Sequence, residues 1–547
     1  MDERKNDSLK IWTPLLFAVI MIAGMTIGFK LRDSLRAKRD IETIIYRNDR
    51  LEQLIDLINE KYVDTVDLNS IYQDAVTGIL SHLDPHTVYI SADQVENVNE
   101  DLEGGFYGIG VEFVIVRDTI QVTSVMPGGP AERVNVQVGD QLVKVGDSIV
   151  AGKKISSGQI IKMLKGKQHT KVMLTLKQPF VAGTRKVEIE RDIVPILSVD
   201  AGIMLDANTG YIKINRFSAT TYDEFTDALT KLKRQNMEDL ILDLRDNPGG
   251  YLDAATLIAD ELISGRKLLV YTQGKRSYKT EYKAGDKNGF ENGRLVVLVD
   301  ENSASASEIL AGAVQDWDRG VIVGRRTFGK GLVQEQYDLG DGAALRLTIA
   351  KYYTPSGRCI QRTYAKGKSA YTEDYYHRFQ TGELMGFDTL AIGDTIPYYT
   401  ANKRVVYGGG GIKPDVYIPY DTTRIAIPVL SMLTSDALSN IMWDYYLRNR
   451  DSLRYRSLSD FEMRFRGEDT VIAMYLRSLP VSERKDAETV LKTPVNNQLF
   501  RLHMKAQFAR YMFKGNGYYQ VLAQDDDEVQ RALQILSDKS YLKIIGR

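Results

Sequence analysis

Residues 295–309 read LVVLVDENSASASEI: an apolar run, then a serine-rich segment, then the start of a second apolar run. The first run predicts a buried strand, and a helix is expected from Ser305 onward. Ser305 and Glu308 fit the S-x-x-E capping box of an ordinary helix start. A serine at a strand-to-helix turn also suits a nucleophile, because the helix N-terminus offers N–H groups and a positive dipole to an oxyanion. The segment alone leaves both interpretations open.

The surrounding residues continue this alternation of strands and helices. Between about Asp200 and Tyr420, the predicted strands are Gly210–Phe217, Leu240–Leu244, Leu295–Val299, Val321–Gly324 and Leu345–Tyr352. The predicted helices between several of them are Tyr222–Gln235, Asp253–Ile263 and Ser305–Trp317. Continuous apolar strands such as Leu240–Leu244 are typical of a sheet that is covered on both faces. An α/β core is therefore expected.

A nucleophilic serine needs a base, and Lys330 is the strongest candidate. None of the five histidines lies in a motif that favours this role; the nearest in sequence is His377. Lys330 stands between glycines in TFGKG, after the apolar strand at 321–324. A lysine can act as a base if desolvation keeps its amine neutral. A phosphate loop is excluded, because no G-x-x-x-x-G-K-[ST] pattern is present.

Residues 104–177 predict a small β-rich module. Its expected strands are Gly110–Val116, Thr119–Val125, Gln141–Val145 and Val172–Leu176, with a helix at Ser157–Leu164. The run YGIGV at 107–111 places two glycines before a strand. Closely spaced glycines can turn N–H groups toward one point and form a nest for a carboxylate, and an edge strand can accept an extended peptide. Taken alone, the run also fits an ordinary turn.

The N-terminal region predicts a membrane anchor followed by helices. Ile11–Phe29 is a run of 19 residues without a charged side chain, and it lacks the small-residue cleavage pattern of a signal peptide. Basic residues lie on both sides but are denser after the run, which by itself favours a cytoplasmic location for the rest of the chain. From about Ile41 to Asn97 the apolar spacing is helical, and Arg424–Arg547 is helical and rich in charge.

Composition narrows the classes of function. The 547 residues are 43% hydrophobic and 26% charged, as in soluble globular proteins. The 71 basic and 72 acidic side chains give a net charge of −1, which argues against broad nucleic-acid binding. One cysteine excludes an intramolecular disulfide and a four-cysteine zinc site. His82 and His86 flank Pro85, which favours a turn with structural histidines over a metal pair.

Several motifs occur together in one order. They are LDPH at 83–86, DNPGG at 246–250, SASASE at 303–308, QD at 315–316, TFGKGLVQ at 327–334 and GIKPD at 411–415. This set resembles the carboxyl-terminal processing (tail-specific) peptidases, which are serine peptidases with a Ser–Lys dyad. YGIGV, the PAER run at 130–133 and VGDQL at 138–142 resemble a PDZ domain.

The resemblance implies a role for individual residues. Ser305 matches the nucleophile, with Ser303 and Ser307 as local competitors; Lys330 matches the general base and Gln334 the residue that orients it. The backbone N–H groups of Ala306 and of Gly250, or Gly249, would form the oxyanion hole. Asp316 matches an acidic position for which a structural role is expected. In the PDZ-like segment, the peptide carboxylate would bind at Gly108, Ile109 and Gly110. No cofactor or metal is implied.

The fold expected is a multidomain α/β chain with an N-terminal membrane anchor. Its parts are a tail at 1–10, a transmembrane anchor at 11–30, an N-terminal helical domain at 41–100, a PDZ-like domain at 103–180, a Ser–Lys peptidase core at 181–422 and a C-terminal helical domain at 424–547. The last part is expected to serve packing, with docking or dimerisation as a weaker alternative.

The function expected is that of a membrane-anchored serine endopeptidase. It would bind accessible, apolar C-terminal tails of protein substrates and cleave peptide bonds through an acyl-enzyme, outside the cytoplasm and without nucleic acid. A homo-oligomer stays open. Two alternatives are a catalytically inactive PDZ scaffold that only captures tails and a carrier of small lipophilic ligands. The presence of Ser305, Lys330 and Gln334 together argues against both.

Overall fold

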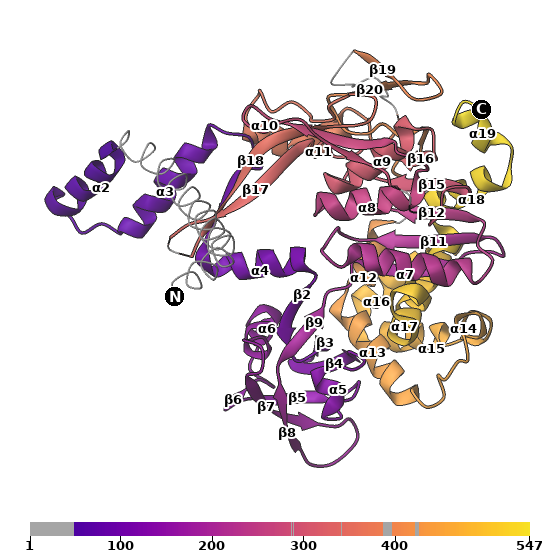
Figure 1. The fold of residues 1–547 in the computed structure, drawn as a ribbon. Coiled ribbons are helices and arrows are strands. Elements are labelled where there is room, and N and C mark those ends of the chain that lie inside the picture. The colour runs from indigo at the N-terminus through magenta and orange to yellow at the C-terminus, as the bar shows by residue number, and fades with distance from the viewer. Residues whose placement is uncertain (1–48, 286, 288, 341, 387–395, 422–425) are drawn as a thin grey trace, which may run out of the picture. The chain divides into compact units, whose positions relative to one another are not determined.

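The computed structural model describes residues 49–285, 287, 289–340, 342–386, 396–421 and 426–547 (Figure 1). The chain divides into two compact units, Met1–Leu83 and Asp84–Arg547. The described part of the first unit holds α2 (Asp49–Lys61) and α3 (Leu68–Ser81). Asp67 caps α3, because its Oδ1 accepts a hydrogen bond from the Asn69 N–H at 3.0 Å.

None of the helices in the described ranges is long and apolar enough to cross a membrane. The predicted anchor at 11–30 lies outside the described residues, so this finding does not bear on it.

A six-stranded sheet forms the centre of the second unit. In spatial order its strands are β10 (Val199–Met204), β11 (Thr209–Ile214), β12 (Asp239–Asp243), β15 (Arg294–Val299), β16 (Val321–Gly324) and β21 (Val416–Tyr417). β10 is antiparallel to β11, and the remaining pairs are parallel. The helices that follow these strands are α7 (Thr221–Lys233), α8 (Leu252–Leu262) and α9 (Ala306–Asp316). The predicted α/β core is confirmed.

Both faces of this sheet are buried, because successive side chains of its strands point to opposite sides. On β12, Leu240 and Leu242 belong to one hydrophobic cluster, whereas Ile241 belongs to another. The first cluster includes apolar residues of α7, α8 and α9. The second includes residues of α18 (Asp527–Ser537) and Tyr541 of α19 (Ser540–Ile544). The last helices of the chain, which the sequence placed in a separate helical domain, therefore form the second covering layer.

An antiparallel sheet stands beside this core. β1 (Val88–Ile90), β18 (Ala344–Tyr353), β13 (Leu268–Gln273) and β14 (Thr280–Lys283) lie in that order, and β17 (Leu332–Asp338) also pairs with β18. The β17–β18 register sets Gln334 opposite Thr348. Smaller elements are α4 (Ala92–Glu103), α10 (Lys368–Thr372), α11 (Asp374–Gln380), β19 (Pro397–Tyr399) and β20 (Val405–Tyr407).

The β-rich module forms as predicted. Its sheet has the order β3 (Val111–Val116), β4 (Thr119–Val125), β5 (Gln141–Val145), β7 (Lys171–Lys177) and β8 (Arg185–Glu190), and β6 (Ser148–Ile149) pairs with β5. α5 (Pro130–Arg133) and α6 (Ser157–Leu164) pack against the same core. β2 (Gly105–Gly108) pairs with β9 (Asp192–Pro195) where the chain enters and leaves the module. β3 lies at the edge of the sheet, which leaves one side open to an added strand.

The C-terminal helices build a core of their own. They are α12 (Ile427–Leu433), α13 (Asp436–Asn449), α14 (Leu458–Arg464), α15 (Glu468–Ser478), α16 (Val481–Leu491) and α17 (Pro494–Leu522), followed by the short turn η1 (Ala523–Asp525). Trp443 of α13 is buried in this core, and its indole N–H donates to Gln121 Oε1 of β4 at 2.8 Å. The helical core therefore contacts the β-rich module directly.

Candidate functional site

Ser305 lies at the turn between β15 and α9, with φ 55° and ψ −113°. A capping residue normally has an extended backbone, and a non-glycine residue with positive φ is strained. Such strain is common at functional sites, where the surrounding structure maintains it. The reciprocal half of the capping box is present, because Glu308 Oε2 accepts the Ser305 N–H at 2.9 Å. The backbone at Ser305 therefore differs from that of a simple helix cap.

The Glu308 carboxylate joins the segments that carry Ser305 and Lys330. Its Oε2 also accepts the Lys330 N–H at 2.8 Å, and its Oε1 accepts the Gly329 N–H at 2.7 Å and the Thr327 hydroxyl at 2.5 Å. Glu308 is fully buried, and burial raises its pKa to about 7, although the hydrogen bonds that it accepts lower it. One oxygen atom thus holds the backbone of both Ser305 and Lys330.

Tyr352 makes a second connection between the same residues. Its hydroxyl lies 2.7 Å from the Lys330 carbonyl oxygen and 3.1 Å from that of Ser305, and it donates to both. The side chain is 1% exposed, so the hydroxyl stays in this dry position. Together, Tyr352 and Glu308 fix the spacing between two residues that stand 25 positions apart in the sequence.

The Lys330 amine lies in a largely desolvated environment. Burial lowers the pKa of Lys330, and the Arg346 guanidinium lowers it further, whereas Glu308 and Asp84 raise it. A lowered pKa increases the fraction of neutral amine near neutral pH, which a general base requires. Within the described residues, Lys330 Nζ makes no hydrogen bond to Ser305 or to Gln334; what the structure brings together is the backbone that carries these side chains.

His86 and Gln334 lie on the Lys330 side of the site. The Gln334 amide donates to the His86 carbonyl oxygen. The His86 ring contacts Phe328 and the hydroxyl of Tyr371, with 2.8 Å between Nε2 and the hydroxyl oxygen. Burial, followed by the Lys330 cation, lowers the pKa of His86 to about 4, so its ring is neutral at neutral pH. As the sequence predicted, the histidine belongs to a turn, since its backbone N–H donates to Asp84 Oδ1 at 2.9 Å.

The DNPGG loop approaches Ser305 closely. A Cβ on Gly249 would lie 2.7 Å from Ser305 Cβ, and one on Gly250 would lie 2.0 Å from the Phe217 carbonyl oxygen, so both positions need glycine. The Gly249 N–H donates to Asn247 Oδ1 at 2.9 Å. Among the described residues, the N–H groups of Gly250 and Ala306 have no acceptor. Two backbone donors, one next to Ser305 in the chain and one in the loop that approaches it, are thus available to a ligand.

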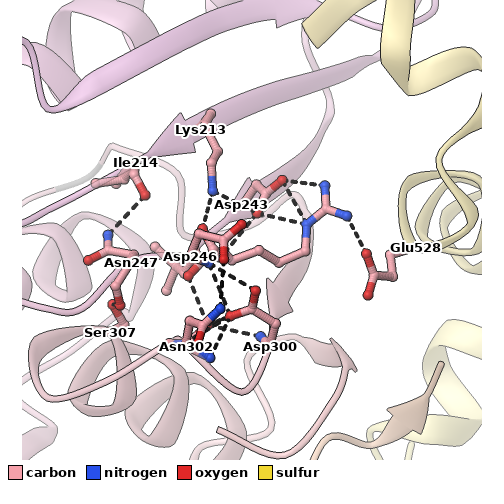
Figure 2. A network of polar contacts seen from close by, with 12 residues as sticks. Lys213, Ile214, Asp243, Asp246, Asn247, Asp300, Asn302, Ser307 and Glu528 are labelled. Atoms are coloured by element: carbon pink, nitrogen blue, oxygen red, sulfur yellow. Dashed lines mark hydrogen bonds and ion pairs between the residues drawn. The ribbon is translucent and has the colours of Figure 1, made fainter. Parts of the chain in front are cut away.

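The hydroxyls of Ser303 and Ser307 have structural partners. Ser303 Oγ donates to the Leu244 carbonyl oxygen at 2.8 Å, and Ser307 Oγ donates to that of Asn247 at 3.0 Å. Both side chains are fully buried, whereas Ser305 is partly exposed. Figure 2 shows Ser307, Asn247 and Asp300 within one network that connects the loop after β12 to the loop after β15.

Asp316 lies at the other end of α9. Its Oδ1 accepts a hydrogen bond from the Arg358 guanidinium at 2.8 Å, and its Oδ2 accepts the Ser356 N–H at 2.9 Å. Asp316 and Arg358 are both buried, and the arginine side chain is fully so. Asp316 therefore has a structural role: it anchors the C-terminal end of α9 to the segment that carries Ser356 and Arg358.

The predicted carboxylate site of the β-rich module lies at the start of its edge strand. Gly110 has φ 75°, and the carbonyl oxygens of Ile109 and Gly110 accept hydrogen bonds from Ala131 and Met126 at 2.9 and 3.0 Å. The N–H groups of Ile109 and Gly110 have no acceptor among the described residues. Gly108 belongs to β2 and pairs with Asp192.

Sequence reasoning missed the residues that hold the site together. Tyr352 belongs to an ordinary apolar strand, and nothing in its local pattern indicates a contact with Ser305 or Lys330. Glu308 was interpreted only as a helix cap, although three residues of the Lys330 loop also donate to it. The SASASE motif contains Glu308, but nothing in the motif indicates that this residue also binds the segment that carries Lys330.

Known protein families and proteins are similar to these parts of the chain. Residues 208–367 match Peptidase family S41, and residues 97–177 match the PDZ domain. A probable CtpA-like serine protease of Staphylococcus aureus (strain N315) is 33% identical over 356 residues, which cover 64% of this chain and 69% of that protein. The carboxy-terminal processing protease CtpA of Bacillus subtilis (strain 168) is 31% identical over 355 residues, which cover 65% and 75%.

A solved structure adds a further likeness. The photosystem II D1 C-terminal processing protease is 30% identical, and the match covers 57% of this chain and 84% of that one with a TM-score of 0.33. The matches with the family profiles end before the C-terminal helices begin.

Proposed function

Since the chain belongs to peptidase family S41, as a serine-type carboxy-terminal processing peptidase with a PDZ domain, we propose that Ser305 is its nucleophile and Lys330 its general base. One observation carries this assignment: Glu308 and Tyr352 each bind the backbone of both residues. The partly exposed Ser305 is favoured over Ser303 and Ser307, whose buried hydroxyls donate to backbone carbonyls.

The reaction proceeds by acyl transfer. The neutral Lys330 amine takes the proton of the Ser305 hydroxyl while Oγ attacks the carbonyl carbon of the scissile peptide bond. The Lys330 ammonium then gives this proton to the leaving amine, which departs as the new N-terminus. Water, deprotonated by Lys330, attacks the ester carbonyl; the Lys330 ammonium then gives this proton to Ser305 Oγ as the bond to Oγ breaks and the product leaves with its new C-terminal carboxylate. The lowered pKa of Lys330 supports its role as a base.

The N–H groups of Gly250 and Ala306 form the oxyanion hole. Ala306 follows Ser305, Gly250 belongs to the loop whose Gly249 approaches Ser305, and neither N–H has an acceptor within the part of the chain that the structure describes. The Gly249 N–H is a weaker candidate because it already donates to Asn247. Preorganised donors of this kind stabilise the charge that develops on the carbonyl oxygen in the transition state. We assign Gln334 the role of orienting the Lys330 side chain from the family motif alone; in the structure its amide nitrogen donates to the His86 carbonyl oxygen.

The PDZ domain binds the C-terminal tail of the protein substrate. The substrate carboxylate accepts hydrogen bonds from the N–H groups of Ile109 and Gly110, and Gly108 permits the close approach of the chain. The tail then adds as a strand along β3, whose outer edge is open. A catalytically inactive scaffold is not favoured, because the chain matches a peptidase family and holds Ser305, Lys330 and Gln334 together.

Tail recognition is tested with two reporters that differ only at the C-terminus, which is a free carboxylate in one and an amide in the other. A loosely folded reporter with an apolar C-terminal tail is cleaved, and amidation of the tail carboxylate weakens its binding by about 10- to 100-fold, the expected loss of a charge-assisted hydrogen bond. The readout is kcat/KM for both reporters, together with the Kd of the matching free and amidated peptides. Equal kcat/KM and equal Kd for the two would contradict carboxylate recognition.

We further propose that residues 11–30 anchor the chain in a membrane and place the peptidase outside the cytoplasm. The uninterrupted apolar run supports an anchor, whereas the basic residues after it favour the opposite orientation. Protease added to intact spheroplasts distinguishes the two orientations. The extracytoplasmic domains are expected to be degraded, and protection until the membrane is dissolved would contradict the proposed orientation.

A further inference from the structure

Glu528, near the start of α18, binds two arginines of the peptidase core. One carboxylate oxygen accepts a hydrogen bond from the Arg245 guanidinium and the other from that of Arg325. The glutamate and Arg325 are each 8% exposed, and the Arg245 side chain is 14% exposed. Figure 2 shows Glu528 facing the network that surrounds the strand ends. Glu528 therefore connects the last layer of the fold to the centre of the molecule.

Each arginine stands at the carboxyl end of a parallel strand, directly before a loop of the site. Arg245 follows β12 by two residues and precedes the DNPGG loop at 246–250. Arg325 follows β16 immediately and precedes the TFGKG segment at 327–331. The two strands lie on either side of β15, and the carboxyl ends of parallel strands are the usual place for functional loops in an α/β sheet.

Each arginine also has partners of its own. Arg245 donates to Asp243 at 2.6 Å and to Asp526 at 3.0 Å, whereas Arg325 donates to Glu301 at 2.6 Å. Lys213 completes the buried charges on this side through its ion pair with Asp243. If Glu528 were lost, each guanidinium would therefore still have a carboxylate partner. Among the described residues, Glu528 is the carboxylate that hydrogen bonds to both arginines, and its loss would remove this link.

We propose that Glu528 is a positioning residue for the peptidase reaction, which holds the oxyanion-hole loop and the Lys330 loop at a fixed separation. This role rests on the proposed function of Ser305 and Lys330. It gives the end of the C-terminal region a part in catalysis, although α18 lies beyond the segments that match the family profiles. The N-terminal turn of α18 suits the charge, because the helix dipole favours an anion there.

The experiment compares two Glu528 variants with a matched control in full-length protein. Glu528→Gln keeps the size of the side chain but removes its charge. Glu528→Asp keeps the charge in the buried site, and so preserves folding, but it is one methylene too short to reach both arginines. The control is Asp239→Asn, which weakens the ion pair of the buried Asp239 with the exposed Arg294 at the opposite end of the same strand β12.

Both Glu528 variants are expected to lower kcat by about 10- to 100-fold, as a small displacement of catalytic groups does, with KM changed less than about twofold. Their affinity for the free tail peptide should equal that of the wild type. Asp239→Asn is expected to lower the melting temperature and to keep the wild-type kcat. Unchanged kcat in both Glu528 variants would overturn the proposal, and so would an equal loss of kcat in the control.

The same assay separates this inference from the one on which it rests. Ser305→Ala is measured in parallel. If cleavage by the purified protein survives Ser305→Ala, the proposed nucleophile is wrong. If cleavage depends on Ser305 but not on Glu528, only the positioning role is rejected.

Discussion

Ser305→Ala is expected to lower kcat for a tailed reporter on the order of 10⁴-fold or more, because the variant has no group that can form the acyl-enzyme. The fold should persist, since the change removes one partly exposed hydroxyl. The measurement is steady-state cleavage of the reporter, with the Kd of the tail peptide as a check on the PDZ domain. The peptide should bind as tightly to the variant as to the wild type.

Ser307→Ala is the matched control for this variant. It removes the buried hydroxyl two residues away, which donates to the Asn247 carbonyl oxygen and has a structural role. The lost hydrogen bond is expected to lower the free energy of unfolding by about 1 kcal/mol, and the activity should stay close to that of the wild type because Ser305 is unchanged. If Ser307→Ala were inactive and Ser305→Ala retained most of its activity, the assignment of the nucleophile would be reversed.

Lys330→Arg is expected to lower kcat by about 10²- to 10⁴-fold, as much as Lys330→Met, although it keeps the positive charge. A guanidinium stays protonated at any pH that the protein tolerates and cannot accept the Ser305 proton. Lys351→Arg, on the exposed position of β18, is the control for the chemistry of the substitution and should leave kcat unchanged.

The pH dependence of the wild type follows from the same residue. The neutral amine is the reactive form, so kcat/KM should rise as pH increases up to the pKa of Lys330, which burial places below its ordinary value. The residual activity of Lys330→Met should not rise over this range. A fully active Lys330→Arg variant, or a wild-type rate that falls as the amine becomes neutral, would contradict the role of Lys330.

Much of the central sheet could be predicted from the sequence, because each strand is a short apolar run followed by a polar turn. The run at 295–299 and the helix after Ser305 appear in the structure within one residue of the expected ends. The same reasoning missed β13 and β14: the apolar run LLVY at the start of β13 was not assigned to a strand, and β14 reads TEYK, is mostly exposed and gives no apolar signal. β14 forms by pairing with β13, and β13 also pairs with the distant β18, which a local pattern does not reveal.

The candidate site was predictable only in part for a related reason. Family motifs lead to Ser305, Lys330 and Gln334, but the contacts that hold them depend on distant segments. Tyr352 meets Ser305 only because β18 folds beside the core, and Glu528 meets Arg245 only because the last helices return to cover the sheet. Neither residue has a distinctive local sequence, and the sequence placed the second in a packing domain without chemistry.

The most direct test of the Ser–Lys mechanism is to trap the acyl-enzyme and locate it. The wild type is mixed with an activated ester of an apolar-tailed peptide, quenched in acid and examined by mass spectrometry after digestion. The account predicts one added acyl group on the peptide that contains Ser305, and a much slower accumulation of this species in Lys330→Met. An acyl group on another residue, or equal accumulation in Lys330→Met, would contradict it.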